Sequence, residues 1–469
     1  MSDVELTRRG ALRAALAAGG ALVLPGCAAG GLGSGPASGP SLGAAAENYL
    51  RRQGEKLGVP SISLLAYSAP QAEAIHQLAP RFTDLTGIAV NWTALDEQSA
   101  ANKAAVSLGS GSASYDVVHL TSDLLPTYAS RGWLADLDRL RRAGTVPGWG
   151  TSAYGRATTD LLRWKDTLYA APMFLGTQLF YYRTDVFRRY GIGTPPRTFA
   201  ELREVCAKVH GTQLSAIALR SAPSPSQLLF VWSAWLYAFG GSYYRRYADG
   251  SYSGVALDSP AAVRSLQLYG TLLRQYAPTG ATNWSVEDVT RAFTTGRVAM
   301  VQDGAVFGGT FNDPKSSQVA GKVGTFVIPS GTAGRFVPYN CHGWGVARTS
   351  TRAAAAWLFV QWATVQATLT AAAAGPVGFS TPPIATIYTS RSYAKKYGFD
   401  DFVPSVTRTI SVAEDGNVSP LRGDPNYLPG TTDWSTVGQQ VSEQLSRAVT
   451  GQTSAAAAVR AAAAVVSGR

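Results

Sequence analysis

Short apolar runs alternate with segments of helical periodicity from about residue 60 onward. The run 61–69 is rich in strand-forming residues, and in 70–87 apolar side chains recur every three or four positions before a glycine. The segment 88–95 again has the composition of a strand. A strand, a helix and a second strand at this spacing indicate a βαβ unit, which implies a parallel sheet.

The alternation continues along the rest of the chain and predicts two series of α/β elements. In 166–192, two strand-like halves flank Gly176, and a second series begins nearby. A helix is predicted from Ala353 to about Ala374, and two helices separated by a glycine close the chain. Further strands are predicted in 115–122, 215–221, 297–304, 321–329 and 339–347, and further helices in 99–109, 124–133, 198–211 and 226–241.

Length and composition favour a globular body of two domains. Residues 60–469 are more than one simple core usually holds. Charged residues make up 15% of the chain, against about 25% in a typical protein, while there are 21 Tyr and 11 Trp. Much of the surface must therefore be neutral polar or aromatic. A long apolar segment is missing from this body, which we predict to be soluble.

The charge pattern argues against nucleic acid as a partner. The formal net charge is +11, but the basic residues are scattered, whereas nucleic-acid binders usually cluster them. We attribute the charge to a solvated surface that faces an anionic envelope. Two residues, Cys206 and Cys341, are the cysteines of the body, and we expect no disulfide between them.

Metal, nucleotide and serine-hydrolase chemistry have no support in the sequence. The chain lacks a His-Glu-x-x-His motif, a Cys-x-x-Cys motif, a phosphate-binding loop and a Gly-x-Ser-x-Gly elbow. We therefore predict no cofactor and no metal site. The four histidines are isolated in the sequence: His76, His119, His210 and His342.

The N-terminal segment 1–27 resembles an export signal. Arg8 and Arg9 precede an apolar run too short to span a bilayer, as in twin-arginine signals. The sequence LPGC that ends at Cys27 resembles the lipobox of bacterial lipoproteins, in which the cysteine is lipidated. An ordinary secretory signal that contains Cys27 is the alternative. Residues 28–59 begin with Gly, Ser, Pro and Ala, and we predict a flexible tether there.

The order of segments in the body resembles the extracellular solute-binding proteins of sugar-importing ABC transporters, the maltose-binding-protein-like family. The resemblance is carried by YDVVHL with LLPTYASRGWLADLD, by LYAAPMFLGTQLFYYRTDVFRRYGIGTPPRTFAEL, AWLYAFGGSYY, AFTTGRVAMVQDGA and HGWGVA, and by the helix-Gly-helix tail. It implies an α/β, two-lobed periplasmic-binding-protein-like fold with hinge strands between the lobes. The first lobe would hold 60–172 plus 340–385, and the second 173–339 plus 386–469.

The same resemblance implies a binding protein and not an enzyme. It would capture a carbohydrate (a sugar, oligosaccharide or polyol) and deliver it to an ABC permease, as a monomer held by a lipid anchor at the outer face of the cytoplasmic membrane. Two alternatives stay open: a binder of a glycerophosphodiester or another polar solute, and a surface-anchored glycoside hydrolase. The hydrolase would need two carboxylates across a sugar, a role for Asp123 and Asp303.

Candidate ligand residues follow the predicted strands, because crevices in open α/β sheets lie beyond the carboxyl ends of the strands. Carboxylates, amides, arginines and aromatic faces suit a polyhydroxylated ligand. Ser68 follows the first strand, Glu97 the second, and Ser122 and Asp123 the third. Helix capping is the alternative role for Asp123 and for the neighbouring Asp96.

In the second lobe, candidates come from the resemblance to the family. Gly176 replaces an acidic residue that several sugar-binding relatives carry, and a sugar-stacking tryptophan that often follows Gly304 is absent. For Trp235, the alternative role is that of a buried core residue. The guanidinium of Arg422 could bind two hydroxyls or a phosphate. The resemblance implies ligand contacts for Gln178, Trp235, Asp303, Gly304, Gly343, Trp344, Arg422 and Trp434.

Overall fold

The computed structural model describes residues 40–112, 114–248 and 251–468, with the side chains of Gln98 and Ser435 left out. The predicted export signal 1–27, the lipidation at Cys27 and the first part of the tether lie outside these residues. The fold described below belongs to the body of the chain.

The prediction of a tether over 28–59 is wrong for its last part. Helix α1 (Ala44–Leu57) packs against α2 (Pro70–Thr86). Leu50 is fully buried, and a side chain at Gly54 would collide with the Thr86 carbonyl. Ala46, Leu50 and Gly54 are spaced by four residues and give α1 a face of small and apolar residues, which lets the two helices approach closely.

The first three strands form the parallel arrangement that the βαβ pattern predicts. β1 (Ser61–Tyr67) lies between β2 (Ala89–Leu95) and β3 (Val117–Thr121) and is parallel to both. Helix α2 connects β1 to β2, and α3 (Glu97–Gly109) connects β2 to β3. The carboxyl ends of the three strands therefore meet at one edge of the sheet.

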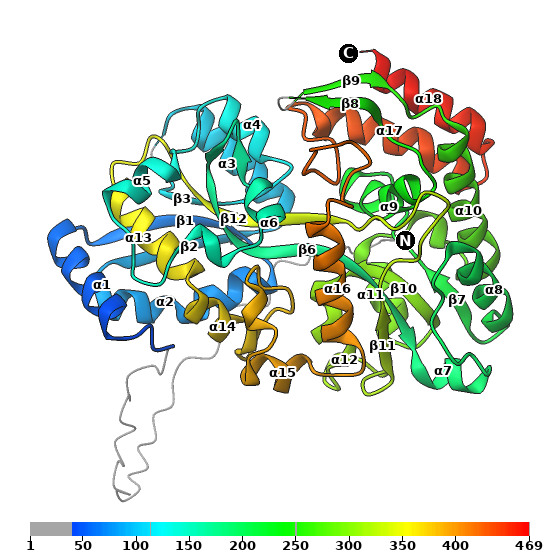
Figure 1. Cartoon of the computed structure of the whole chain (residues 1–469), viewed down its shortest axis with the longest axis horizontal. Coiled ribbons are helices and arrows are strands. Elements are labelled where there is room, and N and C mark those ends of the chain that lie inside the picture. The colour runs from blue at the N-terminus through cyan, green and yellow to red at the C-terminus, as the bar shows by residue number, and fades with distance from the viewer. Residues whose placement is uncertain (1–39, 113, 249–250, 469) are drawn as a thin grey trace, which may run out of the picture. The chain divides into compact units, whose positions relative to one another are not determined.

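Strand β6 (Ala170–Arg183) runs without interruption through Gly176, so the two predicted half-strands are one element. Its first half pairs with β12 (Tyr339–Val346), which also pairs with β3. Its second half pairs with β10 (Val298–Gly304) and β11 (Val323–Phe326). Figure 1 shows β6 passing from one part of the sheet into the other.

The complete sheet is mixed. Its order is β2-β1-β3-β12-β6-β10-β7, with β11 paired to β6 off this path. β7 (Ser215–Ala218) is parallel to β10, whereas β6 is antiparallel to β12, β10 and β11. β6 connects the β1–β3 part of the sheet to the β7–β10 part, the position expected of a hinge strand.

The long helix predicted over 353–374 is two helices, α13 (Ala353–Thr364) and α14 (Gln366–Ala374). Val365 between them has an extended backbone. The Thr364 carbonyl accepts a hydrogen bond from the Tyr154 hydroxyl at 2.7 Å, and the Thr364 hydroxyl accepts one from the Trp149 indole at 2.8 Å. These hydrogen bonds from residues outside the helix take the place of the bonds that would continue α13 beyond Thr364.

The remaining elements are helices on the two parts of the sheet and two short hairpins. The hairpin β8–β9 is absent from the sequence expectations. The elements are α4 (Leu125–Ser130), α5 (Leu137–Ala143), η1 (Thr151–Ala153), α6 (Arg156–Asp160), β4 (Arg163–Trp164), β5 (Thr167–Leu168), α7 (Thr184–Arg189), α8 (Phe199–Val209), η2 (Pro225–Leu229), α9 (Phe230–Ala238), β8 (Tyr244–Ala248), β9 (Ser251–Val255), α10 (Pro260–Tyr276), η3 (Ala281–Asn283), α11 (Val286–Thr294), η4 (Ala305–Phe307), α12 (Gly308–Asn312), η5 (Ala385–Ile387), α15 (Arg391–Tyr397), α16 (Phe402–Glu414), α17 (Trp434–Val449) and α18 (Ala455–Ser467).

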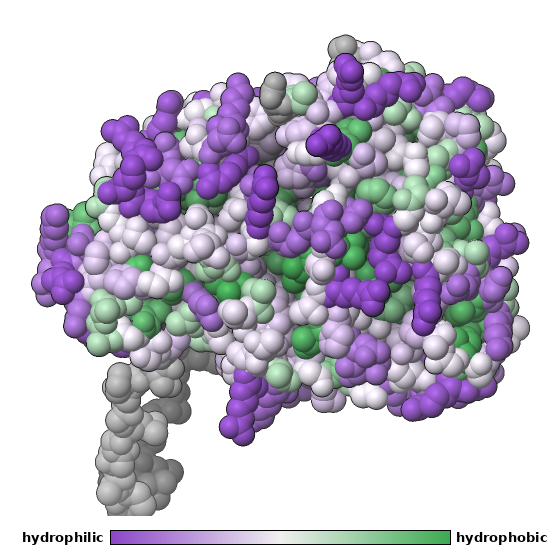
Figure 2. All heavy atoms as spheres, viewed as in Figure 1, coloured by the Kyte–Doolittle hydropathy of each residue, from purple (hydrophilic) through white to green (hydrophobic). Residues whose placement is uncertain are grey.

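Cys206 and Cys341 are both buried and free, which confirms the expectation of no disulfide. Within the described ranges, no helix combines the length and the hydrophobicity needed to cross a bilayer. On the face shown in Figure 2, hydrophobic residues form separate patches among hydrophilic ones.

Candidate functional site

Three polar residues gather at the carboxyl ends of β1, β2 and β3. Ser68 follows β1, Glu97 is the first residue of α3 after β2, and Asp123 lies between β3 and α4. All three side chains are exposed. Asp96 instead caps α3, since its Oδ1 accepts a hydrogen bond from the Ser99 amide at 2.9 Å. Glu97 and Asp123 are thus the carboxylates that this edge offers to a ligand.

The two carboxylates influence each other and an arginine from the other part of the sheet. Burial, together with the charge of Asp123, raises the pKa of Glu97 to about 7, and Arg220 opposes this shift. Burial also raises the pKa of Asp123, against a hydrogen bond from Thr121. Both residues are nevertheless exposed to solvent.

Asp123 does not cap the following helix. The N-cap position of α4 is Leu124, and no side-chain cap bond is formed there. Two tyrosines flank the carboxylates: burial raises the pKa of Tyr67, and the charges of Tyr128, Glu97 and Asp123 add to the effect. The Tyr128 hydroxyl donates to the Ala101 carbonyl at 3.1 Å and so ties α4 to α3. The edge therefore combines carboxylates with aromatic side chains.

Arg220 faces this edge from the end of β7, and the sequence analysis missed it. Its Nε donates to Asp303 Oδ1 at 3.0 Å, its Nη2 contacts the same oxygen, and its Nη1 donates to the Ser226 carbonyl at 3.1 Å. The guanidinium carbon lies 4.9 Å from the ring centre of Phe230 and 5.9 Å from that of Phe307. Arg220 lies inside the predicted strand 215–221, which ends at Ala218 in the structure, so a rule that selects charges after predicted strands passes over it.

Asp303 lies at the end of β10, and one of its two carboxylate oxygens accepts no hydrogen bond from the described residues. Its Oδ1 accepts from Arg220 and from the Gly304 amide at 2.6 Å. Its Oδ2 is buried and has no hydrogen-bond partner within the described part of the chain. The Gly304 carbonyl accepts from the Tyr181 hydroxyl at 3.0 Å. A ligand hydroxyl or a water that donates to Oδ2 would remove this unfavourable burial.

Gln178 and Trp235 belong to a buried chain of hydrogen bonds. Gln178 Nε2 donates to the Phe230 carbonyl, and Gln302 Nε2 donates to Gln178 Oε1, each at 2.7 Å. Trp235 Nε1 donates to Gln302 Oε1, also at 2.7 Å. Gln178 and Trp235 are fully buried and their polar atoms already have partners within the protein, so we leave them out of the proposed ligand set.

Ser122, Gly343 and Trp344 hold β12 in the sheet. The Ser122 amide donates to the Cys341 carbonyl at 2.9 Å, and its hydroxyl accepts from the Cys341 amide at 3.3 Å. A Cβ at Gly343 would lie 2.8 Å from the Ala171 carbonyl oxygen. Trp344 is fully buried and meets His119 at 5.0 Å between ring centres. These contacts are structural.

Two histidines that are isolated in the sequence are paired in the structure. His119 Nε2 and His342 Nδ1 lie 3.1 Å apart. The Tyr67 amide donates to His119 Nδ1 at 3.2 Å, so His119 Nε2 carries the proton and donates to His342. Burial lowers the pKa of His342 to about 4 and also lowers that of His119. This neutral histidine pair connects β3 to β12 next to Tyr67.

The late candidates do not join this group. Arg422 is exposed in the loop before α17. Trp434 begins α17 and is buried, with its ring 5.1 Å from that of Tyr243. At Gly176, the space that an acidic side chain would need is filled by the amide of Asn340 on β12. The departure from the family pattern at Gly176 therefore has a steric cause.

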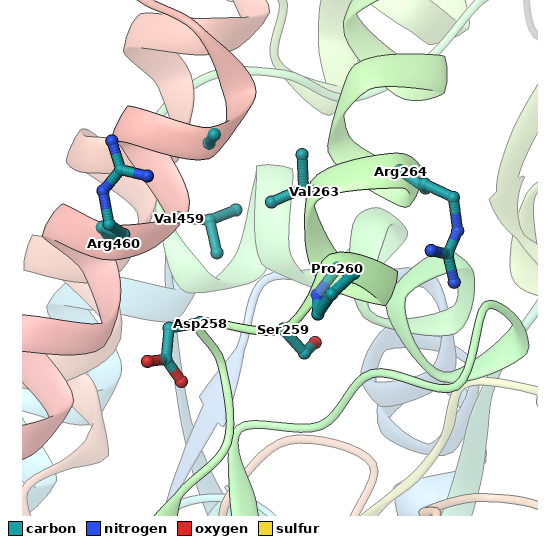
Figure 3. A pocket seen from close by; sticks show the side chains of 8 residues that line it. Asp258, Ser259, Pro260, Val263, Arg264, Val459 and Arg460 are labelled. Atoms are coloured by element: carbon teal, nitrogen blue, oxygen red, sulfur yellow. The ribbon is translucent and has the colours of Figure 1, made fainter.

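Two hollows are found in the described part of the chain. A cavity of about 290 Å³ is lined by Tyr67 and Ser68 at the end of β1, together with Glu73, Trp92 and Val377, among others. A second, of about 440 Å³, lies between α10 and α18, where Val263 and Val459 face each other (Figure 3). The second contains none of the candidate residues. Among the described residues, no cluster of His, Cys, Asp and Glu could hold a metal ion.

Comparison with known proteins places these features among solute-binding proteins. The family described as bacterial extracellular solute-binding protein matches residues 68–368. A mannitol-binding protein of Pseudomonas aeruginosa is 24% identical over 80% of this chain and 85% of its own length. An erythritol/L-threitol-binding protein of Mycolicibacterium smegmatis is 23% identical over 93% of both chains. A solute-binding protein from Agrobacterium vitis, with bound D-mannitol, superposes with a TM-score of 0.74 at 23% identity, over 87% of this chain and 97% of its own.

Proposed function

Because the chain belongs to the bacterial extracellular solute-binding proteins, we propose that it captures a carbohydrate for an ABC importer. Its fold is the two-lobed α/β fold of that family. The family is one of binding proteins, and two relatives are named for polyols. A sugar or polyol is therefore the ligand class that we propose.

One observation supports this ligand class above the others. Glu97 and Asp123 at the edge of β1–β3 act electrostatically together with Arg220, which comes from the other part of the sheet. Carboxylate oxygens accept hydrogen bonds from hydroxyls, and arginine donates to hydroxyl oxygens. The partly exposed rings of Phe230 and Phe307, beside Arg220, add apolar faces for the C–H groups of a carbohydrate. We assign ligand contacts to Glu97, Asp123, Arg220 and Asp303.

We propose that the lobes comprise 60–172 with 340–385, and 173–339 with 386–469, and that they close on the ligand. Several hydrogen bonds would then join the lobes, and two of them link α4 and α6 to the C-terminal part of the chain. The Thr127 hydroxyl donates to the Thr432 carbonyl at 3.1 Å, and the Ala157 amide donates to Glu414 Oε2 at 3.1 Å. Opening would break both bonds, and ligand binding would favour the closed form only as far as that form binds it better.

The proposed partner is an ABC permease that accepts the closed, loaded form. Membership of an extracellular family supports export. We further propose a monomer anchored through lipid at Cys27 to the outer face of the cytoplasmic membrane, where one acyl chain alone would hold it only weakly.

A glycoside hydrolase is less compatible with the site, because Asp303 is bound by Arg220 and so is not free to act with Asp123 as an acid–base pair.

A thermal-shift screen of purified protein tests the ligand class. With a saturating sugar or polyol, the melting temperature should rise, because a ligand that binds only the folded state stabilises it. The ligand should be recovered intact. Turnover of an oligosaccharide would refute the binding role, and stabilisation by glycerophosphodiesters alone would replace the carbohydrate.

A further inference from the structure

The site described above carries a charge pattern that bears on which carbohydrates it can accept. Four ionisable groups meet there: Glu97, Asp123, Arg220 and Asp303. Arg220 and Asp303 form an ion pair, and Arg220 has a third bond to the Ser226 carbonyl. The arginine's charge is therefore already matched inside the protein.

The carboxylates of Glu97 and Asp123 have no such partner in the site. The charges that act on Glu97 are those of Asp123, which is negative, and Arg220, which is already paired with Asp303. The group as a whole is negative, although the chain as a whole carries a formal charge of +11. Arg220 is the basic residue that the group contains, whereas Arg422 is exposed in the loop before α17.

We propose that Glu97 and Asp123 act as a charge filter: the site accepts neutral sugars and polyols and excludes anionic ones such as sugar acids and sugar phosphates. This inference rests on the proposed carbohydrate function. An anionic group would have to displace Asp303 from Arg220 or lie beside two carboxylates. Repulsion from two carboxylates a few ångström away would weaken the binding of an anionic ligand relative to a neutral one.

Matched ligand pairs test the filter by titration calorimetry of the full mature chain at pH 7.5. Suitable pairs are D-mannitol with D-mannonate, D-glucitol with D-gluconate, and D-glucose with D-glucuronate, which differ by one CH₂OH group oxidised to a carboxylate. For each neutral member that binds, the oxidised member should bind at least about 50-fold more weakly.

The double variant Glu97→Gln with Asp123→Asn should bind the neutral ligand more weakly and reduce the discrimination to less than about 5-fold. The matched control is Glu55→Gln with Asp84→Asn, which removes two exposed carboxylates on α1 and α2 and should keep the discrimination. Thermal unfolding of each variant shows whether it is folded.

Three outcomes decide the inference. Equal or tighter binding of an oxidised ligand would overturn the filter and leave the carbohydrate function standing. Unchanged discrimination in a folded double variant would also overturn it, because the two carboxylates would not be its source. Binding of none of the six ligands, neutral or anionic, would count against the carbohydrate function itself and would remove the filter with it.

Discussion

At the scale of single residues, the site depends on carboxylates that the fold keeps in an unfavourable environment. Burial and Asp123 hold the pKa of Glu97 at about 7, above its ordinary value. An ionised Glu97 therefore destabilises the ligand-free protein at alkaline pH. Charged groups in binding sites often lower the stability of the ligand-free protein in this way.

Replacement of Glu97 by Gln should stabilise the ligand-free protein at pH 8. The folded state holds the Glu97 proton more tightly than the unfolded chain, so this residue's contribution to stability is full below pH 4.5 and is lost as the pH rises through 7. The advantage of Glu97→Gln should therefore shrink toward zero between pH 8 and pH 4.5. Denaturant unfolding of both proteins across this range measures the difference; a pH-independent difference would contradict the assigned pKa.

The sequence predicted part of this residue-scale site for a clear physical reason. Glu97 and Asp123 follow predicted strands directly, and parallel strands bring their carboxyl ends together. The resemblance to the family implies ligand contacts for Trp235 and Trp344, yet both are core residues. A one-dimensional pattern does not show which face of an element points inward. The pairing of His119 with His342 depends on strand order and could not be predicted from their separate positions.

At the scale of elements, β6 and β12 carry the connection between the two parts of the sheet. The local pattern predicted the strands themselves, but not that β6 continues through Gly176. Its continuity depends on β12, which is distant in the chain and brings Asn340 opposite Gly176. The break between α13 and α14 likewise comes from tertiary bonds made by Trp149 and Tyr154.

Replacement of Gly176 by Ala should destabilise the protein by about 2 kcal/mol or more, because the new Cβ would collide with the side-chain amide of Asn340. Gly193 is the matched control, since a Cβ there would meet nothing within 4 Å. Denaturant unfolding gives both values. A second change, Asn340→Gly, should restore much of the stability of Gly176→Ala. Equal stability of the two single variants would contradict the proposed packing between β6 and β12.

At the scale of the whole molecule, a two-lobed fold carries a negatively charged candidate site in an otherwise basic chain. The order of segments predicts the α/β class, and the resemblance to the family implies the two lobes; comparison with solved structures confirms both. The lobe boundaries and the anchor at Cys27 stay predictions. The first helix, α1, shows where the compact body begins in the described chain, inside the segment assigned to the tether.

The central claim is that a carbohydrate binds between the two parts of the sheet, in contact with Glu97, Asp123 and Arg220. A crystal structure of the protein with the tightest-binding neutral ligand of the six tests it most directly. We expect ligand hydroxyls within hydrogen-bond distance of the two carboxylates and of the Arg220–Asp303 pair. A ligand found elsewhere, for example between α10 and α18, with these four side chains untouched, would contradict it.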